Sequence, residues 1–184
     1  MPLAEVQRAL AHLYTDENAR ARLRSDPADF ARRFALGPAD LAQISPIPAA
    51  RFHAYADSLD RKRANECMRM LPLSARVAGP GFRADFLRYA RTAPLGEGPW
   101  RYRDDAAAFA AWSLRGRGSS GLTGPARALL AHESSFGPGI ALYRYFVPDV
   151  MRAALQGKSL DGLAPRWSLD IRLWPGRRLV LRLT

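Results

Sequence analysis

Few residues of this sequence have the types and spacing that catalysis or metal binding requires. Its three histidines lie far apart, at His12, His53 and His132, and none belongs to an HxH, HxxxH or HExxH pattern that would put two ligands on one face. His132 and Glu133 could form an acid/base pair, but adjacent helical residues point about 100° apart and do not face each other. We therefore expect no metal site or acid/base pair built from sequence neighbours, although folding could still bring distant histidines together.

Cys67 and the glycine-rich segment at 116–124 are the other candidates for chemistry. Cys67 stands in NECMRM on a predicted helix, with no neighbouring base or helix N-terminus to activate a thiolate, so we expect a buried structural cysteine. The segment GRGSSGLTG lacks the lysine and the preceding strand of a phosphate-binding loop. The sequence thus predicts a binding or accessory protein without a cofactor of its own, and not an enzyme acting alone.

The composition indicates a folded globular protein with a basic surface. The chain has 184 residues, of which 48% are hydrophobic, and a net charge of +11. Apart from Lys62 and Lys158 its basic residues are dispersed arginines, so the charge suits an acidic peptide or protein as well as nucleic acid. No apolar run approaches the roughly 20 residues of a membrane span. Because Glu5 and Arg8 stand where a signal peptide would be apolar, and one cysteine suits a reducing compartment, we expect a cytoplasmic protein.

The first part of the chain has the pattern of short helices with clear stops. We expect an N-terminal helical region at 1–45, in which Thr15 caps the second helix and Asp26 caps a third that starts at Pro27. The proline-rich segment ISPIPAA, at 44–50, is expected to end this region.

A central helical region is expected at 46–136. It begins with a long amphipathic helix over 49–70, which Pro72 ends or kinks. Glycine and proline signals then separate several shorter helices. These are expected over 73–78, 82–90, 104–114 and 123–133.

The C-terminal region, 137–184, has a different pattern. Apolar and polar residues alternate along WSLDIRLWPGRRLVLRLT, with a Pro-Gly turn signal in the middle, which predicts a β-hairpin. The aromatic segment 142–147 predicts a third strand, which would relieve the marginal stability of a lone hairpin. The predicted fold class is therefore α+β: mainly helical, with a small C-terminal antiparallel sheet of about three strands packed as one unit with the central helices.

Four stretches of the sequence, taken in order, resemble one family of partner subunits. They are RFHAYADSLDRKRANECMRMLPLSARVAGPGFRADFLRYARTAPL, DDAAAFAAW, ALLAHESS and WSLDIRLWPGRRLVLRL. This arrangement is similar to the MbnC/TglI-like proteins, which are encoded beside multinuclear non-haem iron oxygenases of the MbnB/TglH type that modify cysteines of ribosomal peptides. Within that family it resembles the methanobactin type most. Like residues in the family fall at Arg63, Pro72, Leu73, Phe86, Tyr89 and Glu133.

The resemblance implies a non-catalytic accessory subunit. Such a subunit forms a heterodimer with an MbnB-like iron-dependent oxygenase and helps to bind the leader of a cysteine-containing, MbnA-like precursor peptide. The iron ions and their ligands then belong to the oxygenase, and no metal is expected in this chain. For the methanobactin type the products are oxazolone and thioamide groups, and related members carry out other cysteine modifications.

A free sheet edge could pair with an extended peptide, because its N–H and C=O groups have no strand partner. We expect peptide binding at Tyr143, Tyr145, Arg172, Arg178 and Arg182. We expect the partner interface at Arg61, Arg63, Trp167 and Trp174.

Three alternatives stay open at this point. The hairpin could only cap the helical core, with its edge covered by a loop. The chain could instead be a DNA-binding or regulatory protein that uses the basic helix around Arg61, Lys62 and Arg63, although the proline after that helix is not a helix-turn-helix turn. Or it could be an enzyme that holds a metal of its own.

Overall fold

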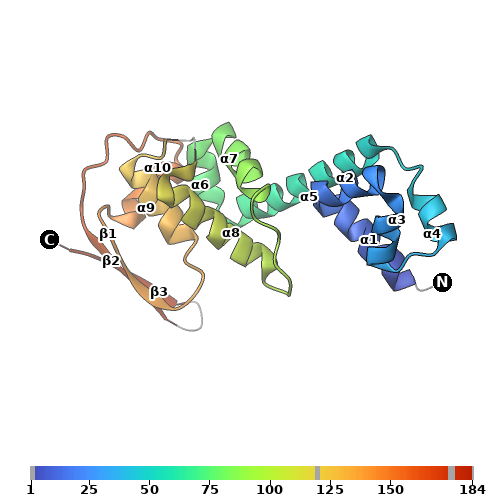
Figure 1. Cartoon of the computed structure of the whole chain (residues 1–184). Coiled ribbons are helices and arrows are strands. Elements are labelled where there is room, and N and C mark those ends of the chain that lie inside the picture. The colour runs from blue at the N-terminus through green and yellow to red at the C-terminus, as the bar shows by residue number, and fades with distance from the viewer. Residues whose placement is uncertain (1–2, 119–120, 174–176, 184) are drawn as a thin grey trace. The chain divides into compact units, whose positions relative to one another are not determined.

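The chain divides into two compact units at Arg61/Lys62. The computed structural model describes residues 3–118, 121–173 and 177–183. By their internal contacts, residues 1–61 form one unit and residues 62–184 the other (Figure 1). The boundary therefore falls inside helix α5 (Ala49–Met70), and not at the proline-rich segment 44–50. The central helices after it and the C-terminal sheet belong to the same unit.

The first unit is a cluster of short helices around an apolar core. Its helices are α1 (Leu3–Thr15), α2 (Glu17–Ser25), α3 (Pro27–Phe34), α4 (Pro38–Ile44) and the first part of α5. Leu13, Phe30 and Phe52 are among the buried side chains of its core. Burial of one apolar face of each short helix stabilises the unit, since helices of this length are marginal alone.

Aspartates cap two helices of this unit. The Asp26 carboxylate accepts a hydrogen bond from the Asp29 N–H at 2.8 Å, as the Asp-Pro signal predicted. The cap of α2 is Asp16, which accepts from the Asn18 N–H at 2.8 Å. The prediction of Thr15 at that position was wrong, because the Thr15 hydroxyl donates to a carbonyl of the preceding helix instead.

The second unit contains the larger helical core. After the end of α5 come α6 (Pro72–Ala78), α7 (Pro80–Ala90), α8 (Arg101–Trp112), a π-helical segment η1 (Ser113–Arg117), α9 (Gly124–Glu133) and α10 (Val147–Leu155). The rings of Phe82 and Phe86 meet Phe109 edge to face, with centroids 5.1 and 5.2 Å apart. Proline in the first turn of α6, α7, α9 and α10 supplies a fixed φ where no N–H is needed. Among the described helices, none is long and apolar enough to cross a membrane.

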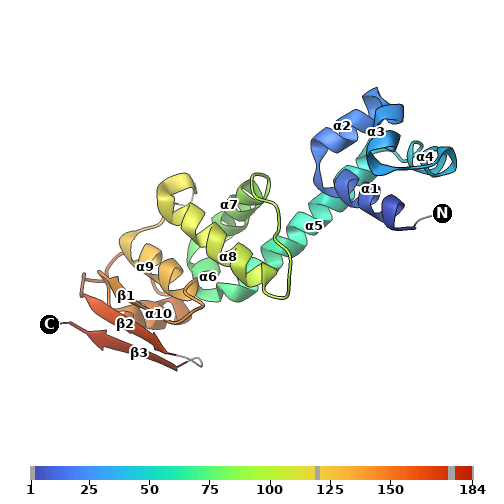
Figure 2. The ribbon, with the colours of Figure 1, turned by 60° about the horizontal axis from the view of Figure 1, so that its bottom comes forward.

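A three-stranded antiparallel sheet completes the second unit. Its strands are β1 (Gly139–Tyr143), β2 (Ser168–Leu173) and β3 (Arg177–Arg182), in the order β1-β2-β3. Figure 2 shows β2 in the middle and β3 on the outer side of the sheet. The predicted mainly helical α+β fold with a small C-terminal sheet is therefore confirmed.

The third strand begins and ends earlier than the aromatic segment suggested. It covers 139–143 and not 142–147, because Val147 starts α10, with Pro148 in the first turn of that helix. Helix α10 was not predicted from the sequence, although Val147, Val150 and Ala154 have helical spacing and are buried.

Candidate functional site

The C-terminal sheet has two faces of opposite character. Successive residues of a strand point to opposite sides, so the register fixes which side chains share a face. One set, which includes Tyr143, Asp170 and Arg178, packs toward α9, and we call it the inner face. The other set includes Ile140, Leu142 and Leu179, and we call it the outer face.

The inner face is fixed to α9 by a contact between a histidine and an aspartate. His132 Nδ1 lies 3.1 Å from Asp170 Oδ2, and both side chains are buried. The Tyr143 ring stands edge-on to the imidazole, with ring centroids 5.9 Å apart. Sequence spacing could not reveal this contact, since its residues are 38 positions apart. A weak signal was present, because Asp170 is the sole acidic residue of 167–184.

Arg178 links β3 to both partners of that contact. Its Nε donates to Asp170 Oδ1, its Nη1 lies near His132 Nε2, and its Nη2 donates to the His132 carbonyl, each at 3.1 Å. The guanidinium thus lies at the C-terminal end of α9, where the helix dipole favours a cation. We call His132, Asp170 and Arg178 the inner network.

The inner network holds His132 in its neutral form. Arg178 can only donate, so His132 Nε2 must accept, and the single proton belongs on Nδ1, which donates to Asp170. Burial and the Arg178 guanidinium lower the pKa of His132 below its ordinary value, and the Asp170 carboxylate offsets this only in part. The histidine therefore serves here as a bridge between strand and helix.

Arg172 and Gly139 meet on the same face at the hairpin end of the sheet. They are cross-strand partners, and a Cβ on Gly139 would lie only 2.8 Å from Arg172 Nη2. The missing side chain at 139 therefore leaves room for the guanidinium. Nε and Nη1 of Arg172 are buried and have no hydrogen-bond partner among the described residues.

Tyr145 lies just beyond β1 and packs inside the unit. Its carbonyl accepts from the Ser168 hydroxyl at 2.9 Å. Its phenol oxygen lies 2.6 Å from the position of a Cβ on Gly124, so its ring packs against the start of α9. Of the five expected peptide-binding residues, Tyr143 is buried and Arg178 is engaged in the inner network, while Arg182 is exposed on β3.

The direction of the backbone groups at the β3 edge follows from one hydrogen bond. The Leu183 N–H donates to the Trp167 carbonyl at 2.9 Å. In an antiparallel pair the bonding residues alternate, so odd-numbered residues of β3 point their N–H and C=O groups toward β2. The backbone groups of Arg178, Val180 and Arg182 therefore point to the side where β3 has no strand neighbour among the described residues.

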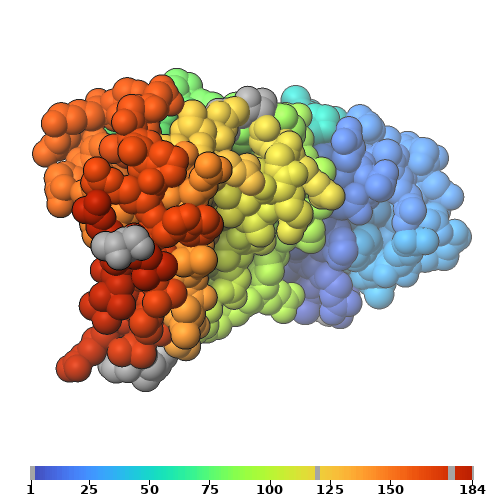
Figure 3. Space-filling model, turned by 90° about the vertical axis from the view of Figure 1, so that its left-hand side faces the viewer, coloured from blue at the N-terminus to red at the C-terminus, as the bar shows by residue number. Residues whose placement is uncertain are grey.

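The outer face is an exposed apolar surface. Cross-strand partners place Ile140, Ile171 and Leu179 in one row. Leu142, Leu169 and Leu181 form the next. Of the thirteen large hydrophobic residues that the described structure leaves exposed, seven lie on this face or at its ends: Ile140, Leu142, Trp167, Leu173, Leu179, Leu181 and Leu183. The C-terminal strands, orange to red in Figure 3, lie at the surface of the molecule.

The expected partner-interface residues lie in different settings. Arg61 is exposed on α5, at the end of the first unit. Trp167 is exposed just before β2, at the end of the outer face. Trp174 lies outside the described residues. Arg63 is buried, and its side chain is directed into the core of the second unit.

Arg63 holds α5 to the segments around α7 and α8. Its Nη2 and Nε donate to the Asp105 carboxylate, at 2.9 and 3.2 Å. Nη1 donates to the Ala90 carbonyl, and Nη2 donates also to the Ala93 carbonyl. Tyr89 donates to the same carboxylate at 3.2 Å. Burial and Asp105 raise the pKa of Tyr89 to about 12. We therefore regard Arg63 as a structural residue, which leaves only Arg61 and Lys62 of the basic cluster exposed.

His132 and Glu133 serve different contacts, as adjacent helical residues should. While His132 meets the sheet, the Glu133 carboxylate accepts from the N–H groups of Leu73 (3.0 Å) and Ser74 (2.7 Å). N–H groups in the first turn of a helix have no acceptor within that helix, so the Glu133 carboxylate caps α6. The expectation that the two side chains do not pair is confirmed.

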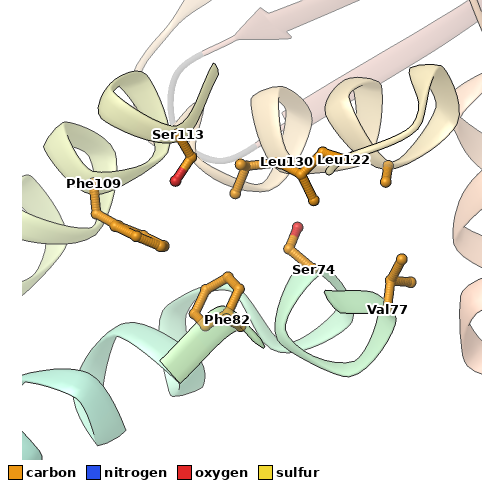
Figure 4. Close-up of a pocket in the computed structure, with 8 residues that line it drawn as sticks. Ser74, Val77, Phe82, Phe109, Ser113, Leu122 and Leu130 are labelled. Atoms are coloured by element: carbon orange, nitrogen blue, oxygen red, sulfur yellow. The ribbon is translucent and has the colours of Figure 1, made fainter. Parts of the chain in front are cut away.

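The remaining candidates for chemistry lie in the helical core. Cys67 is buried as expected, and burial raises the pKa of its thiol, so it is a poor nucleophile. No group of three or more histidine, cysteine, aspartate or glutamate residues suited to a metal ion occurs among the residues that were described. A cavity between α6, α7, α8 and α9 has a volume of about 10 Å³. Figure 4 shows the Ser74 and Ser113 hydroxyls directed into it, but it has room for no more than about one water.

Part of the chain is similar to a known domain. The family model described as SCO6045-like, C-terminal domain, matches residues 45–115. The match spans α5 to α8, including the Arg63 network, and it ends before α9 and the sheet. No curated protein matches the chain.

Proposed function

We propose that this chain is the non-catalytic accessory subunit of an iron-dependent peptide-modifying oxygenase. In this proposal it forms a cytoplasmic heterodimer with an MbnB-like oxygenase, which holds the iron. The accessory chain binds the leader of a cysteine-containing, MbnA-like precursor peptide, which the oxygenase converts to oxazolone and thioamide groups or a related product. The task of this chain is thus recognition and positioning.

The observation that carries the proposal is the free edge of β3. Every residue of β3 is at least partly exposed, and the backbone groups of Arg178, Val180 and Arg182 have no strand partner among the described residues. An extended peptide can add to such an edge through main-chain hydrogen bonds. The inner network supports this use, because Arg178 anchors the edge strand to α9 before any peptide arrives.

Charge supports the choice of an acidic peptide segment. Arg177 and Arg182 are exposed at the two ends of β3, and the whole chain carries a net charge of +11. A basic edge attracts an acidic segment and speeds its association, an effect that salt screens.

The test uses proline at a position whose N–H points to the free edge. Val180→Pro removes that donor and leaves the β2–β3 hydrogen bonds in place, while Val180→Ala removes the side chain and keeps the donor. With the chain assembled on the iron oxygenase encoded beside it, the affinity for a fluorescent leader peptide should fall at least tenfold for Val180→Pro. For Val180→Ala it should stay within about twofold.

Three results would contradict the proposal. One is the same leader affinity in Val180→Pro as in the wild-type complex. Another is the lack of an oxygenase and a short cysteine-containing peptide among the neighbouring reading frames. The third is stoichiometric iron in the purified chain alone, which would make it an enzyme with its own metal.

A further inference from the structure

The outer face of the sheet has the pattern of a buried layer. Its two central rows contain only isoleucine and leucine, from all three strands in register. Ile140 is 72% exposed and Leu142 56% exposed. A sheet normally buries its apolar face against a second layer about 10 Å away. Among the described residues, the helices pack on the polar inner face instead, through the inner network.

The border of this face is basic. Arg177 has an outer-face position opposite Leu173, and Arg144 and Arg166 are exposed where β1 ends and β2 begins. No acidic residue occupies an outer-face position in the described strands, since Asp170 points to the inner face. The face therefore combines an apolar centre with cations at its border, which suits a partner with an apolar centre and carboxylates around it.

We propose that the outer face is the surface on which the catalytic oxygenase subunit docks, through an apolar patch bordered by carboxylates. This inference rests on the proposed function and adds the location and chemistry of the heterodimer contact. A second copy of this chain fits less well, because pairing two outer faces would bring their border arginines together in a chain of net charge +11. Straight rows of isoleucine and leucine in register suit the packed side chains of a folded protein better than a fluid lipid surface.

Docking of the oxygenase on the outer face leaves the β3 edge available to the peptide. Docking covers a face of the sheet, while strand addition uses the backbone groups in its plane. Both can occur at once, so the oxygenase and the leader would share one small sheet. Leu179 and Leu181 would then lie near both partners.

The experiment compares two pairs of substitutions on β1, the strand farthest from the peptide edge. Ile140→Glu with Leu142→Glu, and Ile140→Lys with Leu142→Lys, remove the same apolar surface and add opposite charges. Binding to the purified oxygenase encoded beside this chain is measured by titration calorimetry. The Glu pair should weaken binding at least thirtyfold, and the Lys pair severalfold less, since carboxylates on the partner repel only the former.

Leu155→Glu is the matched control. Leu155 is 60% exposed on α10, away from the outer face, so its substitution should leave oxygenase binding within twofold. Circular dichroism and the unfolding midpoint show whether each variant is folded. Because the replaced side chains on β1 are mostly exposed, we expect all variants to fold.

The outcomes separate the two proposals. If the wild-type chain does not bind the oxygenase, both are overturned. If it binds, and the Glu pair binds within twofold of it, only the docking face is wrong. The docking face is also wrong if the Glu pair abolishes a dimer of this chain in sedimentation, or binding to phosphatidylserine vesicles, while oxygenase binding is unchanged.

Discussion

The inner and outer faces of the C-terminal sheet reverse the usual arrangement. Antiparallel sheets commonly place apolar residues toward the core and polar residues toward water. Here Asp170, Arg178 and the neutral His132 meet between sheet and helix, while isoleucine and leucine rows are exposed. The difference shows that the inner contact combines directional hydrogen bonds with the packing of Tyr143 against Ala128 and Val147, whereas the outer face leaves its apolar side chains exposed. Substitutions on the two faces should therefore have very different effects on the stability of the free chain.

The largest effect is expected for the buried carboxylate. Asp170→Asn keeps the shape of the side chain but leaves the Arg178 guanidinium without the carboxylate that it contacts at 3.1 Å. We expect the free energy of unfolding to fall by about 2 kcal/mol, less than for a fully buried ion pair, because the Arg178 side chain is 31% exposed. Urea denaturation followed by tryptophan fluorescence measures it. The exposed Asp161→Asn is the control and should change stability by less than about 0.5 kcal/mol. Equal losses of unfolding free energy in the two variants would show that the inner network does not stabilise the fold.

A smaller effect is expected from pH. Since the folded state lowers the pKa of His132, it favours the neutral imidazole, and Asp170, Arg178 and Arg172 are the charged groups that act on it. Stability from this group is therefore fully present above the ordinary value of 6.5 and is lost as pH falls below it. Between pH 7.5 and 5.5 the loss should be at most about 1.4 kcal/mol, the limit for a histidine that stays neutral in the folded state.

Two variants isolate this pH dependence. His132→Gln keeps a neutral side chain at every pH. It should therefore remove the contribution of His132 to the slope of unfolding free energy against pH. His53→Gln, at an exposed histidine, should retain it. If His132→Gln and the wild type lose the same stability at acidic pH, the neutral bridge between Asp170 and Arg178 is refuted.

The smallest effect is expected on the outer face of the free chain. Leu142→Thr keeps a strand-forming residue and removes apolar surface that is already 56% exposed, so stability should change by less than about 0.5 kcal/mol. Thermal unfolding of the isolated chain measures this. A loss above 2 kcal/mol would mean that the outer face already contributes to the stability of the free chain, and the contrast between the faces would disappear.

The sequence predicted the order of elements well, because its signals are local. The bounds of α5 agree with the expected 49–70, and proline and glycine placed α6, α7 and α9 within a few residues. The small antiparallel sheet followed from alternation in the hairpin. Helix α10 was missed because its start at Val147 lies inside the aromatic segment that favoured a strand.

The site was harder to predict, because alternation tells which residues share a face and not which face meets the helices. Arg178 and Arg172 were expected to contact a peptide, and both point to the inner face. The contact that decides the orientation, between His132 and Asp170, joins residues 38 positions apart with no spacing rule. Burial of Arg63 depends in the same way on Asp105, 42 positions later.

Arg178 has a double role in this sheet, with consequences for how the protein can evolve. Its backbone belongs to the free edge of β3, while its side chain belongs to the inner network. A substitution there cannot change the edge without also loosening the strand from α9. Of the three edge-facing residues, only Val180 and Arg182 lie outside the network. If the edge binds a peptide as proposed, divergence toward a new peptide would therefore accumulate at these two positions, with Arg178 held constant by the requirements of folding.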